Sequence, residues 1–322
     1  MKPMIFAAAA MLGGIMPVLA EDTSGYAPIN GLEMYYEIHG EGEPLVLLHG
    51  AYMSIPSNWD ALLPTLSKDH KVIAVELQNH GRTSDRDTPI TYEGMADDVA
   101  ALLDHLKVEK AALFGYSMGA GVAIRVAMQH PDKVTRLVAA SGSISYDALP
   151  DGFDDMIKTI TPELFANTPF AEEYKRLSKT PENFPALVEK LKALDLDPFA
   201  WSEEEFAKIN VPSLLIFGDA DVIKVDHIAK MHKLLGGITD GDTNGLPKTQ
   251  LLVLPGTSHI NVFFNPANVE IMKAVVPTFL KQELPAKPSF SFERQAMAAT
   301  LDGAGIGLPR SRAASSQASI AS

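Results

Sequence analysis

The sequence contains no cysteine among its 322 residues, and it has fewer cationic side chains than anionic ones. The absence of cysteine excludes thiol nucleophiles, disulfide bonds, iron–sulfur clusters and cysteine-ligated zinc. The 27 Lys and Arg residues against 40 Asp and Glu residues give a formal net charge of −13, which argues against nucleic acid and anionic membranes as main partners. The remaining composition, 46% hydrophobic and 21% charged, is that of a globular protein.

Long apolar runs are also absent, with one exception at the N-terminus. Lys2 precedes an apolar stretch over residues 4–19, and small residues, Val18 and Ala20, occupy the −3 and −1 positions before Glu21. This pattern predicts a secretory signal peptide over residues 1–20, cleaved after Ala20. The alternative, an uncleaved membrane anchor, is disfavoured because the stretch is shorter than the roughly 20 residues of a spanning helix. We therefore expect a secreted or periplasmic protein that is not bound to the membrane.

Short apolar runs alternate with longer helical patterns in the rest of the chain. Continuous runs of this kind are typical of strands buried on both faces, as in a parallel sheet covered by helices. The runs lie at residues 45–48, 71–75, 111–114, 137–140, 213–217 and 251–254, and helical patterns at 91–106, 118–130 and 269–280. Residues 33–38 predict an additional antiparallel edge strand. The sequence therefore predicts an α/β fold with a mostly parallel, doubly wound sheet over residues 21–284.

Two segments depart from this alternation. Residues 146–208 have no strand pattern, only proline-punctuated helical patterns rich in aromatic residues, and predict a helical insertion between two strands. Residues 285–322 are rich in Ala, Ser and Gly and predict a flexible C-terminal tail. The tail contains a glycine-rich stretch at 303–307, but a phosphate-binding loop requires a preceding strand, which is missing there.

The central motif is the sequence GYSMG at residues 115–119, which lies between a predicted strand and a predicted helix. This is the setting of a nucleophile elbow, in which Ser117 occupies a tight, strained turn. Side chains two residues before and after the serine would clash with neighbouring backbone, so Gly115 and Gly119 meet a steric need. The motif predicts a nucleophilic serine.

A serine hydroxyl becomes nucleophilic when a histidine removes its proton and a carboxylate orients that histidine. With this type of turn the chain order is Ser, acid, His. Of the nine histidines, only His259 lies in a loop after a late strand. Two acids, Asp219 and Asp221, follow the strand over residues 213–217, and both satisfy the order.

Acyl transfer also needs backbone N–H groups that stabilise the developing oxyanion. One is expected from Met118, the residue after the nucleophile. The other is expected from the loop after an early strand, where Gly50 allows close approach of the backbone and Ala51 supplies the amide.

These pieces together resemble the serine α/β-hydrolase fold superfamily over residues 31–282. The resemblance rests on LLHG at 47–50, ELQNHGRTS at 76–84, GYSMG at 115–119, GDAD at 218–221 and PGTSH at 255–259. The second piece departs from the superfamily's common pattern, because Glu76 stands for Asp and Asn79 for Gly. The resemblance implies that residues 146–208 form a cap over the active site and that Asp221 is the triad acid. Asp219 is then expected to cap the turn.

The resemblance implies a hydrolase that cleaves carboxylic esters or lactones of a small, apolar substrate through an acyl-enzyme on Ser117. Such a reaction needs no metal and no organic cofactor. The serine argues against haloalkane dehalogenases and epoxide hydrolases, whose nucleophile in this fold is aspartate. Carbon–carbon hydrolases, perhydrolases and peptidases use the same triad and remain alternatives, as does a catalytically idle binding protein of this fold. Fold resemblance does not select the substrate, and the oligomeric state is left open.

Overall fold

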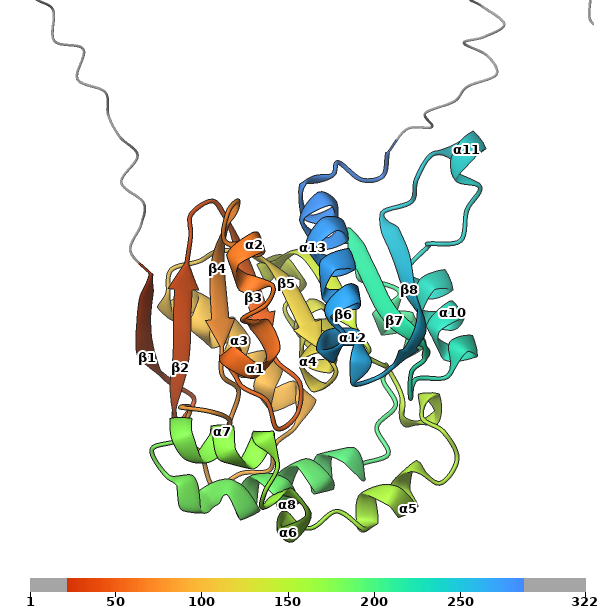
Figure 1. The fold of residues 1–322 in the computed structure, drawn as a ribbon. Helices are drawn as coiled ribbons and strands as arrows, with labels where there is room; N and C mark the ends of the chain where they lie inside the picture. Colours follow the sequence, from red (N-terminus) through yellow and green to blue (C-terminus); the bar gives the residue numbers. More distant parts are fainter. Residues whose placement is uncertain (1–21, 287–322) are drawn as a thin grey trace, which may run out of the picture.

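The computed structural model describes residues 22–286, whose eight strands form one sheet with helices on both faces (Figure 1). The strand order is β1-β2-β4-β3-β5-β6-β7-β8, with β3 to β8 parallel and β1 and β2 antiparallel. The strands are β1 (Thr23–Ile29), β2 (Leu32–His39), β3 (Glu43–Leu48), β4 (His70–Val75), β5 (Ala111–Tyr116), β6 (Val134–Ala140), β7 (Ser213–Ala220) and β8 (Thr249–Ser258). The predicted fold class is confirmed.

Helices cover the two faces of the sheet as separate layers (Figure 1). They are α1 (Ile55–Trp59), α2 (Leu63–Leu66), α3 (Tyr92–His105), α4 (Met118–Gln129), η1 (Pro131–Lys133), α10 (Val225–Leu234), α12 (Asn261–Phe264) and α13 (Pro266–Lys281). The short α11 (Gly241–Asn244) lies away from the sheet, in the segment between α10 and β8 (Figure 1). None of the helices in the described part of the chain is long and apolar enough to span a membrane.

The side chains of each continuous apolar run pack into two hydrophobic cores, one on each face of the sheet. On β3, Leu45 and Leu47 pack in the cluster that contains residues of α1, α2 and α13. Val46 and Leu48 pack in the cluster that contains residues of α3, α4 and α10. Successive side chains of a strand point to opposite faces of the sheet, so a strand covered on both faces is apolar at every position.

The strand predicted at residues 33–38 is antiparallel, as expected, but it is not at the edge of the sheet. It forms part of β2, which pairs with β1 on one side and with β4 on the other, so β1 is the edge strand. The sequence of β1 has no apolar run, because Gly25 and Pro28 interrupt it and only Ala27 and Ile29 are buried. An edge strand has fewer buried positions and therefore gives a weaker sequence signal.

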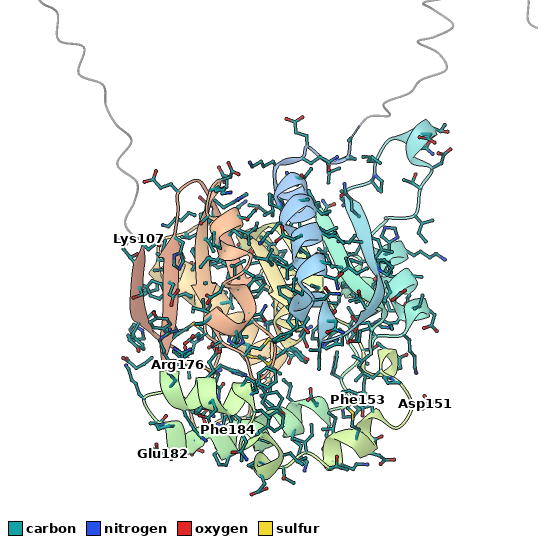
Figure 2. The ribbon with its side chains drawn as sticks, viewed as in Figure 1. Lys107, Asp151, Phe153, Arg176, Glu182 and Phe184 are labelled. Carbon is teal, nitrogen blue, oxygen red and sulfur yellow. The ribbon has the colours of Figure 1, made fainter. Side chains whose placement is uncertain are left out.

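A layer of short helices lies between β6 and β7 in the chain and against one end of the sheet (Figure 1). We call residues 146–208 the cap. Figure 2 shows Phe184 toward one end of this layer and Phe153 toward the other. The cap contains η2 (Tyr146–Ala148), α5 (Phe153–Lys158), α6 (Pro162–Phe165), α7 (Pro169–Leu177), η3 (Pro181–Asn183), α8 (Phe184–Asp195) and α9 (Glu203–Phe206).

The loop after β4, where the sequence departs from the superfamily pattern, binds the cap. Asn79 has φ 58°, a left-handed conformation that glycine adopts freely and asparagine tolerates. Its Oδ1 accepts a hydrogen bond of 2.7 Å from the Tyr174 hydroxyl on α7, and both groups are buried. Lys190 on α8 donates to the carboxylate of Asp85 in the same loop at 2.7 Å. Asparagine in place of glycine therefore adds an attachment point for the cap.

The second departure, Glu76, lies at the start of the same loop and binds Arg82 near its middle. Its buried carboxylate accepts hydrogen bonds from the backbone N–H of Arg82 at 2.5 Å and from the Arg82 guanidinium at 2.6 Å. Gly81 has φ 52°, and a Cβ there would come within 2.3 Å of this carboxyl group, so the position favours glycine. Burial raises the pKa of Glu76 to about 7, and Arg82 opposes this rise.

The predicted signal peptide at residues 1–20 lies outside the described residues, and so does the predicted tail beyond residue 286. Both stay predictions from the sequence.

Replacing Tyr174 by Phe removes the only hydroxyl that binds Asn79 Oδ1 within the described chain and leaves that oxygen buried. We expect the variant to lose about 1–2 kcal/mol of unfolding free energy, the cost of an unsatisfied buried acceptor. Urea denaturation measures this loss. Tyr146→Phe, in the same cap, is the matched control; equal stability of both variants would show that the Asn79 contact does not hold the cap.

Candidate active site

Ser117 lies in a strained turn between β5 and α4. Its backbone has φ 53° and ψ −118°, a conformation that costs energy for a residue other than glycine. A Cβ at Gly115 would come within 2.0 Å of the Gly119 carbonyl oxygen, and one at Gly119 within 2.1 Å of the Leu48 carbonyl oxygen. Only glycine fits at either position, as the sequence argument requires.

The structure brings Ser117, His259 and Asp221 together in one hydrogen-bonded chain. His259 Nε2 lies 2.8 Å from Ser117 Oγ, and His259 Nδ1 lies 2.7 Å from Asp221 Oδ1. The ionised carboxylate can only accept, so Nδ1–H donates to Asp221 and Nε2 is left to accept from the serine hydroxyl. This arrangement allows the histidine to remove the serine proton.

The Asp221 side chain is fully buried, but its pKa is lowered. Burial alone raises the pKa; the hydrogen bond and positive charge of His259, with hydrogen bonds from Ser141 and the Ile223 amide, outweigh burial. Asp221 is therefore a carboxylate at neutral pH. A carboxylate in this position can stabilise a positive charge on the His259 ring.

Asp219, the other candidate acid, has a different position. Its Oδ1 accepts a hydrogen bond of 3.0 Å from the backbone N–H of Thr257, and the amides of Gly256 and Thr257 lower its pKa. It caps the turn that precedes His259 and does not touch the imidazole. The two acids of the GDAD sequence thus hold the same loop in different ways.

The two predicted oxyanion-hole residues, Ala51 and Met118, line one cavity together with Ser117. Met118 is the first residue of α4, so its amide lies at the positive end of a 12-residue helix. Within residues 22–286, neither amide donates a hydrogen bond to another residue. Gly50, before Ala51, donates to Asn58 Oδ1 at 2.9 Å, and this bond holds the loop.

Two residues of this site have no signal in a linear motif. Ser141, directly after β6, donates to Asp221 Oδ2 at 2.6 Å. Tyr116 donates from its hydroxyl to the carbonyl oxygen of His259 at 2.9 Å and so fixes the histidine backbone. The position of Ser141 at the carboxyl end of the strand between β5 and β7 could have indicated its role. Nothing in the sequence pairs Tyr116 with His259.

The cavity at Ser117 has a volume of about 480 Å³, and residues of the cap form part of its wall. We call it the Ser117 cavity. Most cap residues that line it are apolar, for example Met156, Ile157 and Leu194, and one, Asp195, carries a carboxyl group. Asp195 has no signal in the sequence, because it belongs to none of the motifs and stands at the end of a helical pattern with another acid, Asp197, close by.

Another depression, of about 730 Å³, lies over α3 and contains the Arg86–Asp98 ion pair and the hydrogen bond between His130 and Asp97, each at 2.8 Å. Its charged groups already have partners, and it contains no serine. Among residues 22–286, no three His, Asp or Glu side chains are placed to hold a metal ion. The Ser117 cavity is therefore the candidate active site.

Comparisons with known proteins agree with this fold. A family model described as alpha/beta hydrolase fold matches residues 43–196. An sn-1-specific diacylglycerol lipase of Danio rerio is 32% identical over 136 residues, which are 42% of this chain and 42% of that protein. A 2-hydroxymuconate semialdehyde hydrolase of Pseudomonas sp. (strain CF600) is 34% identical over 120 residues, 36% of this chain and 42% of that protein. The chain spans about two fifths of the length of these relatives.

Solved structures match over a longer part of the chain. A carboxylesterase of Bacillus subtilis superposes with a TM-score of 0.62 and 19% sequence identity, covering 82% of this chain and 93% of that one. The three proteins compared above are by name a lipase, a hydrolase and a carboxylesterase, so the comparisons identify the fold and leave the reaction open.

We expect Asp219→Asn to lower the melting temperature at pH 7, because the turn before His259 loses the carboxylate that accepts the backbone hydrogen bond of Thr257. The lowered pKa of Asp219 means that its contribution to stability is present above its ordinary value of 3.8 and is lost as the pH falls through the folded-state pKa. The difference between wild type and variant should therefore shrink below pH 3.8. Melting curves of both proteins from pH 7 to pH 3 measure it, with Asp132→Asn, an exposed acid, as control. A difference that stays constant down to pH 3 would contradict this role.

Proposed function

The chain belongs to the α/β-hydrolase fold superfamily, and from this premise we propose that it is a serine hydrolase that cleaves carboxylic esters or lactones of a small, largely apolar substrate. The observation that carries the proposal is the chain of hydrogen bonds from Ser117 through His259 to Asp221. The strained turn, the two amides without acceptors and the mostly apolar cavity support it.

In the proposed reaction, Ser117 Oγ attacks the substrate carbonyl carbon while His259 Nε2 takes the serine proton. Asp221 stabilises the imidazolium, and the amides of Ala51 and Met118 stabilise the oxyanion. The carbon–oxygen bond to the leaving group then breaks, and His259 gives its proton to the alcohol. Water then gives a proton to His259 and attacks the acyl carbon. The bond from that carbon to Ser117 Oγ breaks, His259 returns the proton to Oγ, and the carboxylic acid leaves. No metal or organic cofactor takes part in these steps.

The complete hydrogen-bonded chain also argues against a catalytically idle binding protein. Binding alone does not require a serine in a strained turn beside a histidine whose other nitrogen is bound by a buried carboxylate, and the strain costs stability. A panel of chromogenic esters of graded acyl length, together with lactones, measures which substrates turn over.

Ser117→Ala should abolish ester turnover and leave the fold intact, because the alanine keeps the turn and removes only the hydroxyl. Any remaining rate acceleration should be about 10³–10⁴-fold over water, from binding and the oxyanion hole. A fluorophosphonate probe should label the wild type once, at Ser117, as located by mass spectrometry of peptides. Labelling at another residue, or unchanged activity of the variant, would show that the nucleophile is elsewhere.

Asp221→Asn should lower kcat by roughly 10⁴, the order of effect that follows loss of the orienting carboxylate in a serine protease. Asp219→Asn should keep kcat close to that of the wild type, because Asp219 contacts the turn and not the imidazole. Steady-state kinetics on one chromogenic ester compare the two variants. The opposite order of rates would make Asp219 the functional acid.

A further inference from the structure

Asp195 is the only acid that lines the Ser117 cavity within residues 22–286. It is the last residue of α8, where the carbonyl groups at the helix end disfavour a negative charge. In the described chain no group donates a hydrogen bond to its carboxyl, and no Lys or Arg lines the cavity. Burial raises the pKa of Asp195 to about 7, and His259 opposes this rise. The carboxyl of Asp195 therefore faces the cavity without a hydrogen-bond donor or a cationic side chain from the described protein.

Tyr52 lines the same cavity and also has an unused polar group. Its hydroxyl is buried and has no hydrogen-bond partner among the described residues. The residue is held firmly: its backbone has φ 63°, its N–H donates to His80 Nε2 at 3.2 Å, and its ring stacks on Phe165 of the cap with the ring centroids 4.5 Å apart. Burial, followed by the charges of Asp195 and Glu189, raises the pKa of Tyr52.

A buried polar group without a partner destabilises a folded protein. The Tyr52 hydroxyl is such a group. The Asp195 carboxyl is half-buried and is also without a protein partner, and both residues line one otherwise largely apolar cavity, which also contains Ser117. We propose that Asp195 and Tyr52 form a polar subsite that binds a hydrogen-bond-donating group of the substrate, a hydroxyl or an ammonium, at a distance from the carbonyl that Ser117 attacks. This inference rests on the proposed function for the location of the reacting carbonyl.

The subsite also predicts which substrates are excluded. A second carboxylate on the substrate would meet Asp195 without a Lys or Arg from the described lining to balance it. Burying two like charges together is unfavourable, so a substrate with a free carboxylate should bind less well than its neutral analogue. A plain alkyl chain leaves both polar groups unsatisfied.

The first experiment compares p-nitrophenyl esters with acyl chains of four to eight carbons that end in methyl, hydroxyl, ammonium or carboxylate, at pH 8. For at least one length, we expect kcat/KM for the hydroxyl or ammonium ester to exceed that for the methyl ester by about tenfold, the worth of one good hydrogen bond. The carboxylate ester should be the poorest. Asp195→Leu should bring the ratio of polar to methyl ester to about one.

Two further variants separate the sources of the effect. Asp195→Asn keeps the shape and can still accept from a hydroxyl, but it loses the charge, so a preference for ammonium should vanish while a preference for hydroxyl stays. Tyr52→Phe should reduce the preference for hydroxyl. Asp197→Asn, an exposed acid two residues after Asp195, is the matched control and should leave all ratios unchanged. Ratios that are the same in the wild type and in both Asp195 variants would overturn the subsite.

A binding measurement keeps this test separate from the proposed reaction. In Ser117→Ala, calorimetric titration with N-methyl amides of the same acids gives dissociation constants without turnover. Tighter binding of the hydroxyl or ammonium amide that is lost in Ser117→Ala/Asp195→Leu supports the subsite even if no ester is hydrolysed, in which case only the proposed function fails. Equal binding of all amides, or no binding of any, would overturn the subsite even if alkyl esters turn over at Ser117.

Discussion

The close contact between Gly119 and the Leu48 carbonyl oxygen is the constraint on which the site depends. It presses the start of α4 against the end of β3, and this contact places the Ser117 hydroxyl at the carboxyl end of the sheet. The same contact brings the α4 amide of Met118 and the loop amide of Ala51 to one cavity. The strain at Ser117 is balanced by the packing of α4, whose residues are largely buried, and by the bond from the Ser117 amide to the Ala140 carbonyl oxygen at 2.8 Å. A looser turn would disperse all of these groups.

The loop that carries His259 is fixed from several sides. Asp219 binds the turn before it, Tyr116 binds its carbonyl oxygen, and Asp221 binds its ring. Because these contacts come from two different strands and from the loop after β7, the imidazole has one orientation. The acid that orients the ring is itself bound by Ser141 at the end of β6. Preorganisation of this kind means that little rearrangement is needed when charge develops on the ring.

The sequence was sufficient for features that depend on local chemistry. Strands buried on both faces produce continuous apolar runs, and a tight turn around Ser117 requires glycine at fixed offsets, so the parallel strands and the elbow could be predicted. The edge strand β1 could not, because an edge strand lacks such a run. Tyr116 could not either, because its partner lies 143 residues away. The contact of Ser141 with Asp221 spans 80 residues, and only the place of Ser141 directly after β6 could have indicated it. Asp195 could not, because no described residue binds its carboxyl. Asn79 could be noticed as a departure, but its contact with Tyr174 depends on how the cap lies on the sheet.

The attachment of the cap through α7 and α8 has a consequence for how this protein can diverge in evolution. Tyr174 and Lys190 bind the loop after β4, so this half of the cap contributes to the stability of the whole domain. The other half, around α5, supplies Met156 and Ile157 to the cavity wall, and Met156 is 52% exposed. Substitutions at a half-exposed wall residue change the shape of the pocket at little cost in stability. New substrate preferences can therefore arise in α5 without loss of the fold, while the α7–α8 half remains under stronger selection.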